Sequence, residues 1–248
     1  MSVRTLAAFS TVRTEGAMLP SDILVRVAAG DKSLGGLEES SYHLVPGEKI
    51  GEATNRAWNR LQAAWSNFQT GREKLAAGDT GTSLTRERWL LPLFQLLDYG
   101  RLQVAKAEEI GGKSYAISHA WQQTPIHLVG CNVDLDRRIQ TAAGGMRSSP
   151  HSLLQELLNR SSQHLWGIVS NGLRLRLLRD NISLTRQAYV EFDLEAMMAG
   201  EAYPDFVLLW LLLHQSRFEA ERPEDCQLEK WSQAARTDGN GQSPPASA

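Results

Sequence analysis

Residues 165–180 constrain the fold more than any other part of the chain, because they read as two strands joined by an Asn-Gly turn. The first half, residues 165–170, is almost wholly apolar, which is typical of a strand inside a sheet. Asn171-Gly172 is the strongest two-residue hairpin signal, since both positions of such a turn require a positive φ. The sequence therefore predicts a sheet that contains this hairpin.

The second strand of this hairpin alternates between apolar and basic side chains. Leu173, Leu175 and Leu177 point to one face, and Arg174 and Arg176 point to the other. We expect the leucine face to pack in the core. The arginine face has two interpretations, a solvated hairpin surface or a strand that contacts phosphate groups.

Basic residues are concentrated in the middle of the chain, although the formal net charge is only -2. Residues 137–186 contain eight Arg, no Lys and two acids, whereas residues 187–248 contain eleven acids and four bases. This asymmetry indicates either an anionic partner or a basic surface that acids from residues 191–201 cover. Weak, sequence-independent binding of duplex DNA is the prediction. The residues predicted to contact DNA are Arg137, Arg138, Arg147, Arg174, Arg176 and Arg179.

Composition argues against a membrane or disulfide-rich protein. The longest apolar run, residues 206–213, is far shorter than the ~20 residues that a membrane span needs. Residues 1–17 lack the sustained apolar segment of a signal peptide. Cys131 and Cys226 are too few for a disulfide framework or a zinc site. We expect a cytoplasmic protein that does not associate with membranes.

The chain divides into three predicted parts. Residues 1–80 are mostly helical, and Trp58 and Trp65 lie one heptad apart on the apolar face of a helix over residues 48–75. Residues 81–221 form the core, and residues 222–248 read as a polar, disordered tail. The core elements expected are a helix at 85–98, strands at 99–106, 114–121 and 125–136, a helix at 150–160, the hairpin, a strand at 188–193 and a helix at 204–218. The predicted class is α+β, with α/β as the alternative: a helical segment followed by a mixed sheet flanked by helices.

The segment Trp166-Gly167-Ile168-Val169-Ser170-Asn171-Gly172 resembles a strand and turn of restriction-endonuclease-like domains. Such domains occur at the N-termini of type IIG restriction-modification enzymes and in type I restriction subunits. Gln155 and Asn159 lie on the preceding helix, where those domains place their Gln-containing helix, and Tyr99-Gly100 is similar to the start of their first strand. The resemblance implies a restriction-endonuclease-like core.

A second resemblance runs along the whole chain. It rests on Glu15-Gly16 with Leu19-Pro20, Trp58-Asn59-Arg60-Leu61, Ser149-Pro150-His151 and Leu158-Asn159-Arg160. These segments are similar to the N-terminal region of large bacterial adenine-specific DNA methyltransferases of BREX- and DISARM-like phage-defence systems. The Asn-Pro-Pro motif that binds the flipped adenine in that family is absent here, as is a glycine-rich cofactor loop after a strand. The resemblance therefore implies an N-terminal part or a shortened copy, with a methyltransferase domain or subunit as partner.

The nuclease resemblance also implies where catalytic residues should lie. PD-(D/E)XK nucleases place an Asp at the start of their second strand and Glu-x-Lys or Asp-x-Lys at the end of the third, and the carboxylates bind Mg²⁺. Here the second strand is predicted to open at Lys113-Ser114 and the third to end at Gly130-Cys131-Asn132. Neither the carboxylates nor the Lys match, so we expect a degenerate site with Ser114 near Gly130–Asn132 and no Mg²⁺ there.

Asp134 and Asp136 are the remaining candidates for catalysis. A two-residue spacing in a strand puts both on one face, so they are either shifted metal ligands or part of a solvated loop. His119, His127, His151 and His164 lack the spacing of a zinc site, so no metal site and no cofactor are predicted outside this pair.

Three functions are therefore open. The first is a DNA-associated, nuclease-like accessory domain that is catalytically silent alone. The second is an active Mg²⁺-dependent endonuclease that uses Asp134 and Asp136. The third is a protein-interaction module that docks through the Trp58/Trp65 helix or the apolar helix after Pro204, and that does not bind DNA.

Overall fold

A mixed seven-stranded sheet organises the protein, with strand order β1-β11-β10-β9-β6-β5-β2. The computed structural model describes residues 9–16, 18–140, 146–181 and 188–240. The strands of the sheet are β1 (Val12–Glu15), β2 (Gln103–Val104), β5 (His119–Trp121), β6 (Thr124–Leu128), β9 (Trp166–Ser170), β10 (Arg174–Arg179) and β11 (Tyr189–Asp193). β6 and β9 pair in parallel, and the other pairs of this sheet are antiparallel.

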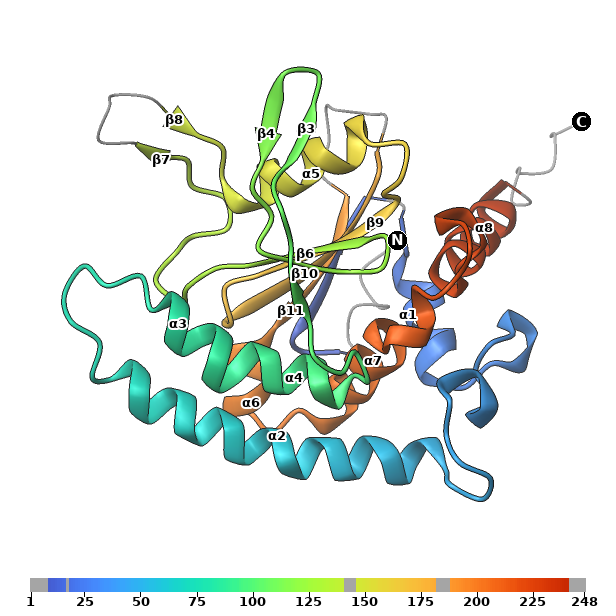
Figure 1. Cartoon of the computed structure of the whole chain (residues 1–248). Coiled ribbons are helices and arrows are strands. Elements are labelled where there is room, and N and C mark those ends of the chain that lie inside the picture. Colours follow the sequence, from blue (N-terminus) through green and yellow to red (C-terminus); the bar gives the residue numbers. More distant parts are fainter. Residues whose placement is uncertain (1–8, 17, 141–145, 182–187, 241–248) are drawn as a thin grey trace, which may run out of the picture.

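Helices cover both faces of the sheet, which confirms the predicted α+β class (Figure 1). One face carries α5 (Pro150–Arg160), and the other carries the helical stretch α3 (Thr82–Thr85), η4 (Arg86–Leu90) and α4 (Leu91–Leu96), with α2 (Ile50–Arg72) outside it. The remaining helices are α1 (Ser21–Ala28), η2 (Lys32–Leu34), η3 (Glu39–Tyr42), α6 (Leu194–Ala199), α7 (Tyr203–Leu213), η5 (Gln215–Arg217), η6 (Pro223–Asp225) and α8 (Gln227–Asn240).

Two small hairpins project on the side of α5 (Figure 1). They are β3 (Glu108–Ile110) with β4 (Lys113–Tyr115), and β7 (Ile139–Gln140) with β8 (Met146–Arg147). The first hairpin overturns the prediction of one continuous strand over residues 114–121. Ile117 N donates to Tyr115 O at 3.1 Å, and this tight turn separates β4 from β5. The strands predicted at 99–106 and 125–136 are likewise shorter, because the regular pairing is confined to β2 and β6.

The order of elements after α3 agrees with the sequence expectation of a helix, three strands, a helix and two strands. β2, β5 and β6 form the first three strands of the sheet, α5 follows, and β9 and β10 form the hairpin. The parallel pairing of β6 with β9 requires a long connection, and α5 lies within that connection.

The aromatic stripe of α2 packs inside the molecule, as predicted. The Trp65 ring lies 4.9 Å from the Trp89 ring of η4, and the Trp58 ring lies 5.1 Å from the Phe206 ring of α7. Trp58, Trp65, Trp89 and Leu93 are all buried. Since α7 is buried as well, neither of the two helices proposed as docking surfaces offers its apolar face to a partner.

A π-helical turn interrupts the helical stretch before Pro92. Pro92 has no N–H, and its ring crowds the carbonyl of the residue four positions earlier, so a widened turn relieves this contact. The turn carries Trp89, whose Nε1 donates to Gly172 O at 2.7 Å. The helix thereby holds the β9–β10 turn in place.

The predicted disordered tail is wrong for residues 227–240. α8 places Leu228 and Trp231 in the core with no exposed surface, and Trp231 Nε1 donates to Gly35 O at 3.1 Å. The two side chains lie three residues apart and share one helix face, a signal that the polar composition of the segment conceals. Residues 241–248 lie outside the described residues.

The first predicted part of the chain shares its core with the second. β1 pairs with β11 at the edge of the sheet, with Val12 opposite Phe192. Asp205 of α7 holds the start of this strand, because its Oδ2 accepts hydrogen bonds from Thr11 N and Thr11 Oγ1, both at 2.7 Å.

Candidate functional site

A cavity of about 450 Å³ opens at the carboxyl ends of the parallel strands β6 and β9. In open sheets with parallel strands this edge is the usual place for ligands. The cavity is lined by Cys131, Asn132, Val133, Asp134, Leu135, Asp136, Asn171, Arg174 and Arg176. The structure thus brings together both predicted catalytic acids, the turn residue Asn171 and two of the predicted DNA-contacting arginines.

The Asn171 side chain builds the wall of this cavity. Its Oδ1 accepts hydrogen bonds from Leu173 N at 3.0 Å and Arg174 N at 2.9 Å, and its Nδ2 donates to Val133 O at 2.9 Å. Of the two predicted turn residues, only Gly172 has a positive φ, 81°. The hairpin therefore turns at Gly172 and Leu173 instead of at Asn171 and Gly172, closed by the 3.2 Å bond from Asn171 N to Arg174 O and by the Asn171 side chain. The same side chain ties it to the loop after β6.

Arg176 is the centre of the polar cluster beside the cavity. It donates to Asp136 Oδ1 from Nη1 at 2.6 Å and to Asp136 Oδ2 from Nη2 at 2.8 Å. Its Nε donates to Glu191 Oε2 at 2.6 Å, and its guanidinium lies 4.6 Å from the centre of the Tyr189 ring. The side chains of Arg176 and Glu191 are only 5% and 4% exposed, so this ion pair is buried.

The cluster shifts the pKa of both partners toward their charged forms. Hydrogen bonds from Arg176 hold the pKa of Asp136 below its ordinary value, although partial burial opposes this. Burial alone would lower the pKa of Arg176, but its hydrogen bonds to Asp136 and Glu191 and their charges together raise it. Asp136 and Arg176 therefore remain ionised over the whole physiological pH range.

His151 completes the cluster from the first turn of α5. Arg176 Nη1 lies 3.2 Å from His151 Nδ1 and can only donate, so Nδ1 is the acceptor and the proton is on Nε2. Within the described chain, this buried Nε2 has no hydrogen-bond partner. Burial, and then the charge of Arg176, lower the pKa of His151 to about 4, so the ring is neutral at pH 7.

The other arginines predicted to contact DNA differ in exposure and in their ion pairs. Arg174 is 44% exposed and lies 3.2 Å from Glu191 Oε1. Arg179 donates from Nε and Nη2 to the buried Glu229 of α8, each at 2.8 Å. Arg137 and Arg138 are exposed, whereas the side chain of Arg147 lies outside the described residues.

The predicted stripe of free arginines is therefore wrong for Arg176 and Arg179. Both faces of β10 are covered, because Leu178 packs in one cluster with Leu154 and Leu157 of α5 while Leu175 and Leu177 belong to the main core. Alternation along the strand therefore does not separate the core from solvent. Acids from β11 and α8 cover the two guanidinium groups instead. For Arg176 this agrees with the alternative in which acids of residues 191–201 cover the basic surface, whereas Glu229, the partner of Arg179, lies outside that segment.

Asp134 and Asp136 do not share one strand face, which agrees with the alternative of a solvated loop. They lie in a loop, where Asp134 Oδ1 accepts a hydrogen bond from Asp136 N at 2.8 Å. In the described parts of the chain, no group of three or more His, Cys, Asp or Glu side chains is arranged to hold a metal ion.

The positions that a nuclease would use are only partly where the sequence predicts them. Gly130, Cys131 and Asn132 lie just beyond the end of the interior strand β6, separated from it by Val129, close to the expected place. Ser114 lies in β4, which pairs with β3 and not with β6, so its predicted place beside Gly130–Asn132 is wrong.

Ser118, His127 and Arg86, instead of Ser114, form the polar group at the start of β5 and the end of β6. Ser118 Oγ accepts from Leu128 N at 2.7 Å, and Ser118 N donates to His127 Nδ1 at 3.3 Å. Arg86 Nε donates to Leu128 O at 2.9 Å, and burial, followed by the charge of Arg86, lowers the pKa of His127 to about 4. Sequence reasoning missed this group because the strand break at residues 115–117 has no strong turn signal.

No protein-family model, curated protein or solved structure matches the chain. Among the helices of the described residues, none combines the length and the apolar character that crossing a membrane requires. The interpretation of the cavity therefore depends on its own residues.

Proposed function

We propose that the chain is a nuclease-like, DNA-associated accessory domain of a bacterial restriction-modification or phage-defence DNA methyltransferase, without catalytic activity of its own. The paired hydrogen bonds between Asp136 and Arg176 carry the proposal. These bonds engage both carboxylate oxygens of Asp136, the acid that would serve as a metal ligand. Asp136 lies at the edge of the sheet where a nuclease-like core would hold its catalytic groups.

The order of elements supports the nuclease-like part of the proposal. Apart from the small hairpins β3–β4 and β7–β8, a helix, three antiparallel strands, a helix and a strand parallel to the third follow one another from α3 to β9. This is the order that the resemblance of the Trp166–Gly172 segment implies.

The chemistry of the cavity supports the absence of catalysis. A divalent ion bound by Asp136 would have to displace the Arg176 guanidinium from both carboxylate oxygens. Arg176 would then keep only Glu191 as an anionic partner in a buried position, which is unfavourable. Asp134 has one oxygen committed to the backbone of its own loop.

The exposed arginines beside the cavity support contact with DNA. Arg137 and Arg138 directly follow Asp136 and are exposed, and Arg174 retains 44% of its side-chain surface. Such groups provide phosphate contacts without base readout, so the proposal is for weak binding, with Kd about 10⁻⁴–10⁻⁶ M.

Titration of duplex DNA at several salt concentrations tests this proposal. Each lost phosphate contact should flatten the slope of log K against log salt by about 0.9, so Arg137→Ala with Arg138→Ala should flatten it by roughly two units. Arg101→Ala with Lys106→Ala removes the same charge beside the opposite edge strand, β2, and should leave the slope nearly unchanged. Equal effects of the two double variants would contradict a DNA surface beside the cavity.

A supercoiled-plasmid assay with Mg²⁺ or Mn²⁺ tests the absence of catalysis. The expected result is no cleavage. Metal-dependent cleavage that disappears in Asp134→Ala and in Asp136→Ala would establish the alternative, an active endonuclease. If the full chain shows neither cleavage nor salt-dependent DNA binding, the protein-interaction alternative is favoured, through a surface other than the buried apolar faces of α2 and α7.

A further inference from the structure

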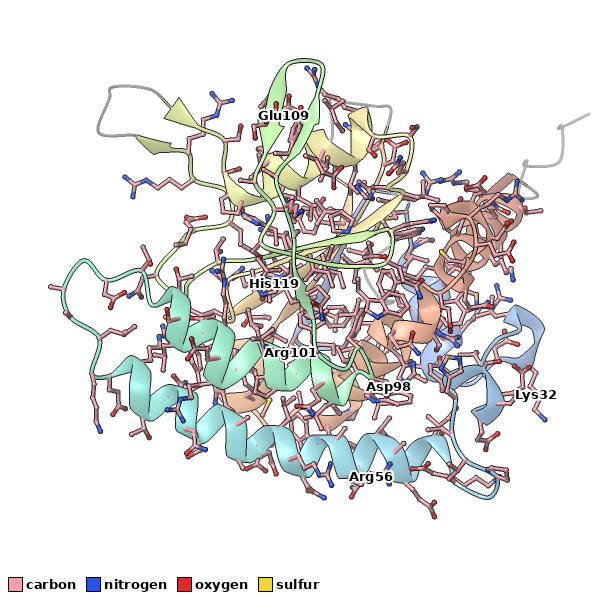
Figure 2. All side chains as sticks on the ribbon, viewed as in Figure 1. Lys32, Arg56, Asp98, Arg101, Glu109 and His119 are labelled. Atoms are coloured by element: carbon pink, nitrogen blue, oxygen red, sulfur yellow. The ribbon has the colours of Figure 1, made fainter. Side chains whose placement is uncertain are left out.

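A second cavity, of about 290 Å³, lies between α2, the C-terminal end of α4 and the C-terminal end of α7. It is on the side of the sheet away from α5 and shares no lining residue with the first cavity. Its polar side chains include His43, Arg56, Arg60, Gln95, Asp98 and His214. Figure 2 shows Arg56 on α2 and Asp98 after α4, on two of the elements that border the cavity.

His214 lines this cavity with a side chain that is only 3% exposed. Ser216 N lies 3.3 Å from His214 Nδ1, and Ser216 Oγ lies 2.8 Å from it. Arg217 donates to the same Oγ from Nε and Nη2, so the hydroxyl proton of Ser216 is directed to Nδ1. The proton of the neutral ring is therefore on Nε2.

This Nε2 has no hydrogen-bond acceptor among the residues that the structure describes. The nearest carboxylate oxygen, Asp98 Oδ2, is 4.0 Å away, beyond hydrogen-bond distance. The His214 side chain is only 3% exposed, so water has little access to it except through the cavity. A ligand atom in the cavity can accept this hydrogen bond.

The backbone at the cavity is strained at two positions. His43 has φ 55° and Asp98 has φ 69°, and they are two of the four non-glycine residues with positive φ in the described ranges. Such conformations are uncommon for residues with side chains and cluster at binding and catalytic sites. Both residues line this one cavity, which is an observation independent of His214.

The α2 wall of the cavity supplies positive charge. Arg56 and Arg60 lie one helical turn apart, and Arg56 forms an ion pair with Glu48. Arg60 is exposed and makes no ion pair with a described residue. The cavity thus offers one uncompensated guanidinium on α2, with an imidazole N–H and a carboxylate on its other elements.

We propose that this cavity binds a small organic anion that also carries hydroxyl or ammonium hydrogen-bond donors. The acidic group binds Arg60 and the Nε2–H of His214, and a donor of the same ligand binds Asp98. A simple anion fits less well, because the Asp98 carboxylate lies beside the imidazole and would repel it. The volume suits a ligand of the size of an amino acid or a glycerol phosphate.

Calorimetric titration of the full chain with glycerol 3-phosphate, L-serine and inorganic phosphate tests this inference. The expected result is that glycerol 3-phosphate or L-serine binds more tightly than inorganic phosphate. Arg60→Gln and Asp98→Asn should each weaken that binding at least about tenfold, which corresponds to 1.4 kcal/mol. Asn tolerates a left-handed backbone, so Asp98→Asn keeps the fold of the loop.

Arg88→Gln is the matched control, because Arg88 is exposed on η4 and does not line the cavity. It should leave the affinity unchanged. The resonances of the His214 ring should shift on saturation, which places the ligand in this cavity. The inference is overturned if none of the three probes binds, if Arg88→Gln weakens binding as much as Arg60→Gln, or if phosphate alone binds and Asp98→Asn strengthens it.

Discussion

Asp136 and Arg176 form two parallel hydrogen bonds, 2.6 and 2.8 Å long, at the edge of the first cavity. The sequence assigns opposite roles to these residues, since Asp136 is a candidate metal ligand and Arg176 a candidate phosphate contact. In the structure Arg176 is shared by two acids, Asp136 and the buried Glu191, and Glu191 also contacts Arg174. The two positive and two negative charges of this network balance, and further positive charge beside the cavity comes from the exposed Arg137 and Arg138.

Substitution of Arg176 should destabilise the protein strongly. Arg176→Ala leaves the buried Glu191 with only the partly exposed Arg174 as a cationic partner, and the loss of one member of a buried ion pair costs about 3–5 kcal/mol. Arg174→Ala is the matched control, because its side chain is 44% exposed and such pairs contribute at most about 1 kcal/mol. Urea denaturation measures both changes. Similar losses in the two variants would show that the Arg176 pair is not buried in solution.

The stability of the protein should fall as the pH is lowered from 6.5 toward 4. Burial, and then Arg176, lower the pKa of His151 from 6.5 to about 4, so the unfolded chain binds this proton first. The contribution of the neutral His151 ring to the free energy of unfolding is fully present above the pKa of the unfolded chain. It is lost as the pH falls toward the folded pKa, with a magnitude of roughly 3 kcal/mol for a shift of this size. Burial also lowers the pKa of His127 to about 4 and that of His214 to about 3, so they add to the same slope.

Unfolding free energies of His151→Phe between pH 4 and pH 7 check this prediction. The variant should lose a part of the pH dependence and keep the parts that His127 and His214 contribute. A slope equal to that of the unsubstituted chain would mean that His151 titrates normally in the folded protein.

Truncation of Trp65 should open a void between α2 and η4. Trp65 is 9% exposed, and the centre of its ring lies 4.9 Å from that of Trp89 and 5.5 Å from that of Phe68. Large aromatic truncations in cores cost about 3–5 kcal/mol, so Trp65→Ala should lower the unfolding free energy by that amount. Trp65→Phe retains most of the packing and should cost much less. A loss below about 1 kcal/mol for Trp65→Ala would contradict burial.

Removal of the Asp205 carboxylate should release the edge strand β1. Two hydrogen bonds of 2.7 Å from Thr11 N and Thr11 Oγ1 end on this buried side chain. Bonds to charged groups contribute about 1.5–3 kcal/mol each, so Asp205→Ala should expose the β1 amides to hydrogen exchange. Amides of β9, which lie inside the sheet, serve as the reference and should keep their protection relative to β1. Uniform loss of protection in both strands would indicate global destabilisation instead.

Local patterns in the sequence determined the type and order of most elements. The three- and four-residue spacing over residues 48–75 predicts α2 and the burial of Trp58 and Trp65, because helix periodicity is a property of neighbouring residues. Ser149-Pro150 predicts the start of α5, since Ser149 Oγ accepts from Ser152 N and proline suits the first turn. The apolar composition of residues 204–213 likewise predicts the burial of α7.

The tertiary structure alone decided what the polar residues do. Arg176 reads as a surface residue until β11 supplies Glu191 and the loop after β6 supplies Asp136, which lies 40 positions away. Glu229 pairs with Arg179 only because α8 folds back onto the sheet, although its segment reads as a disordered tail. The second cavity joins His214 to Asp98 across more than a hundred residues. Periodicity depends only on residues that are close in sequence, so the sequence predicts the helices and strands. Charge compensation depends on which distant elements become neighbours, so the sequence does not predict the sites.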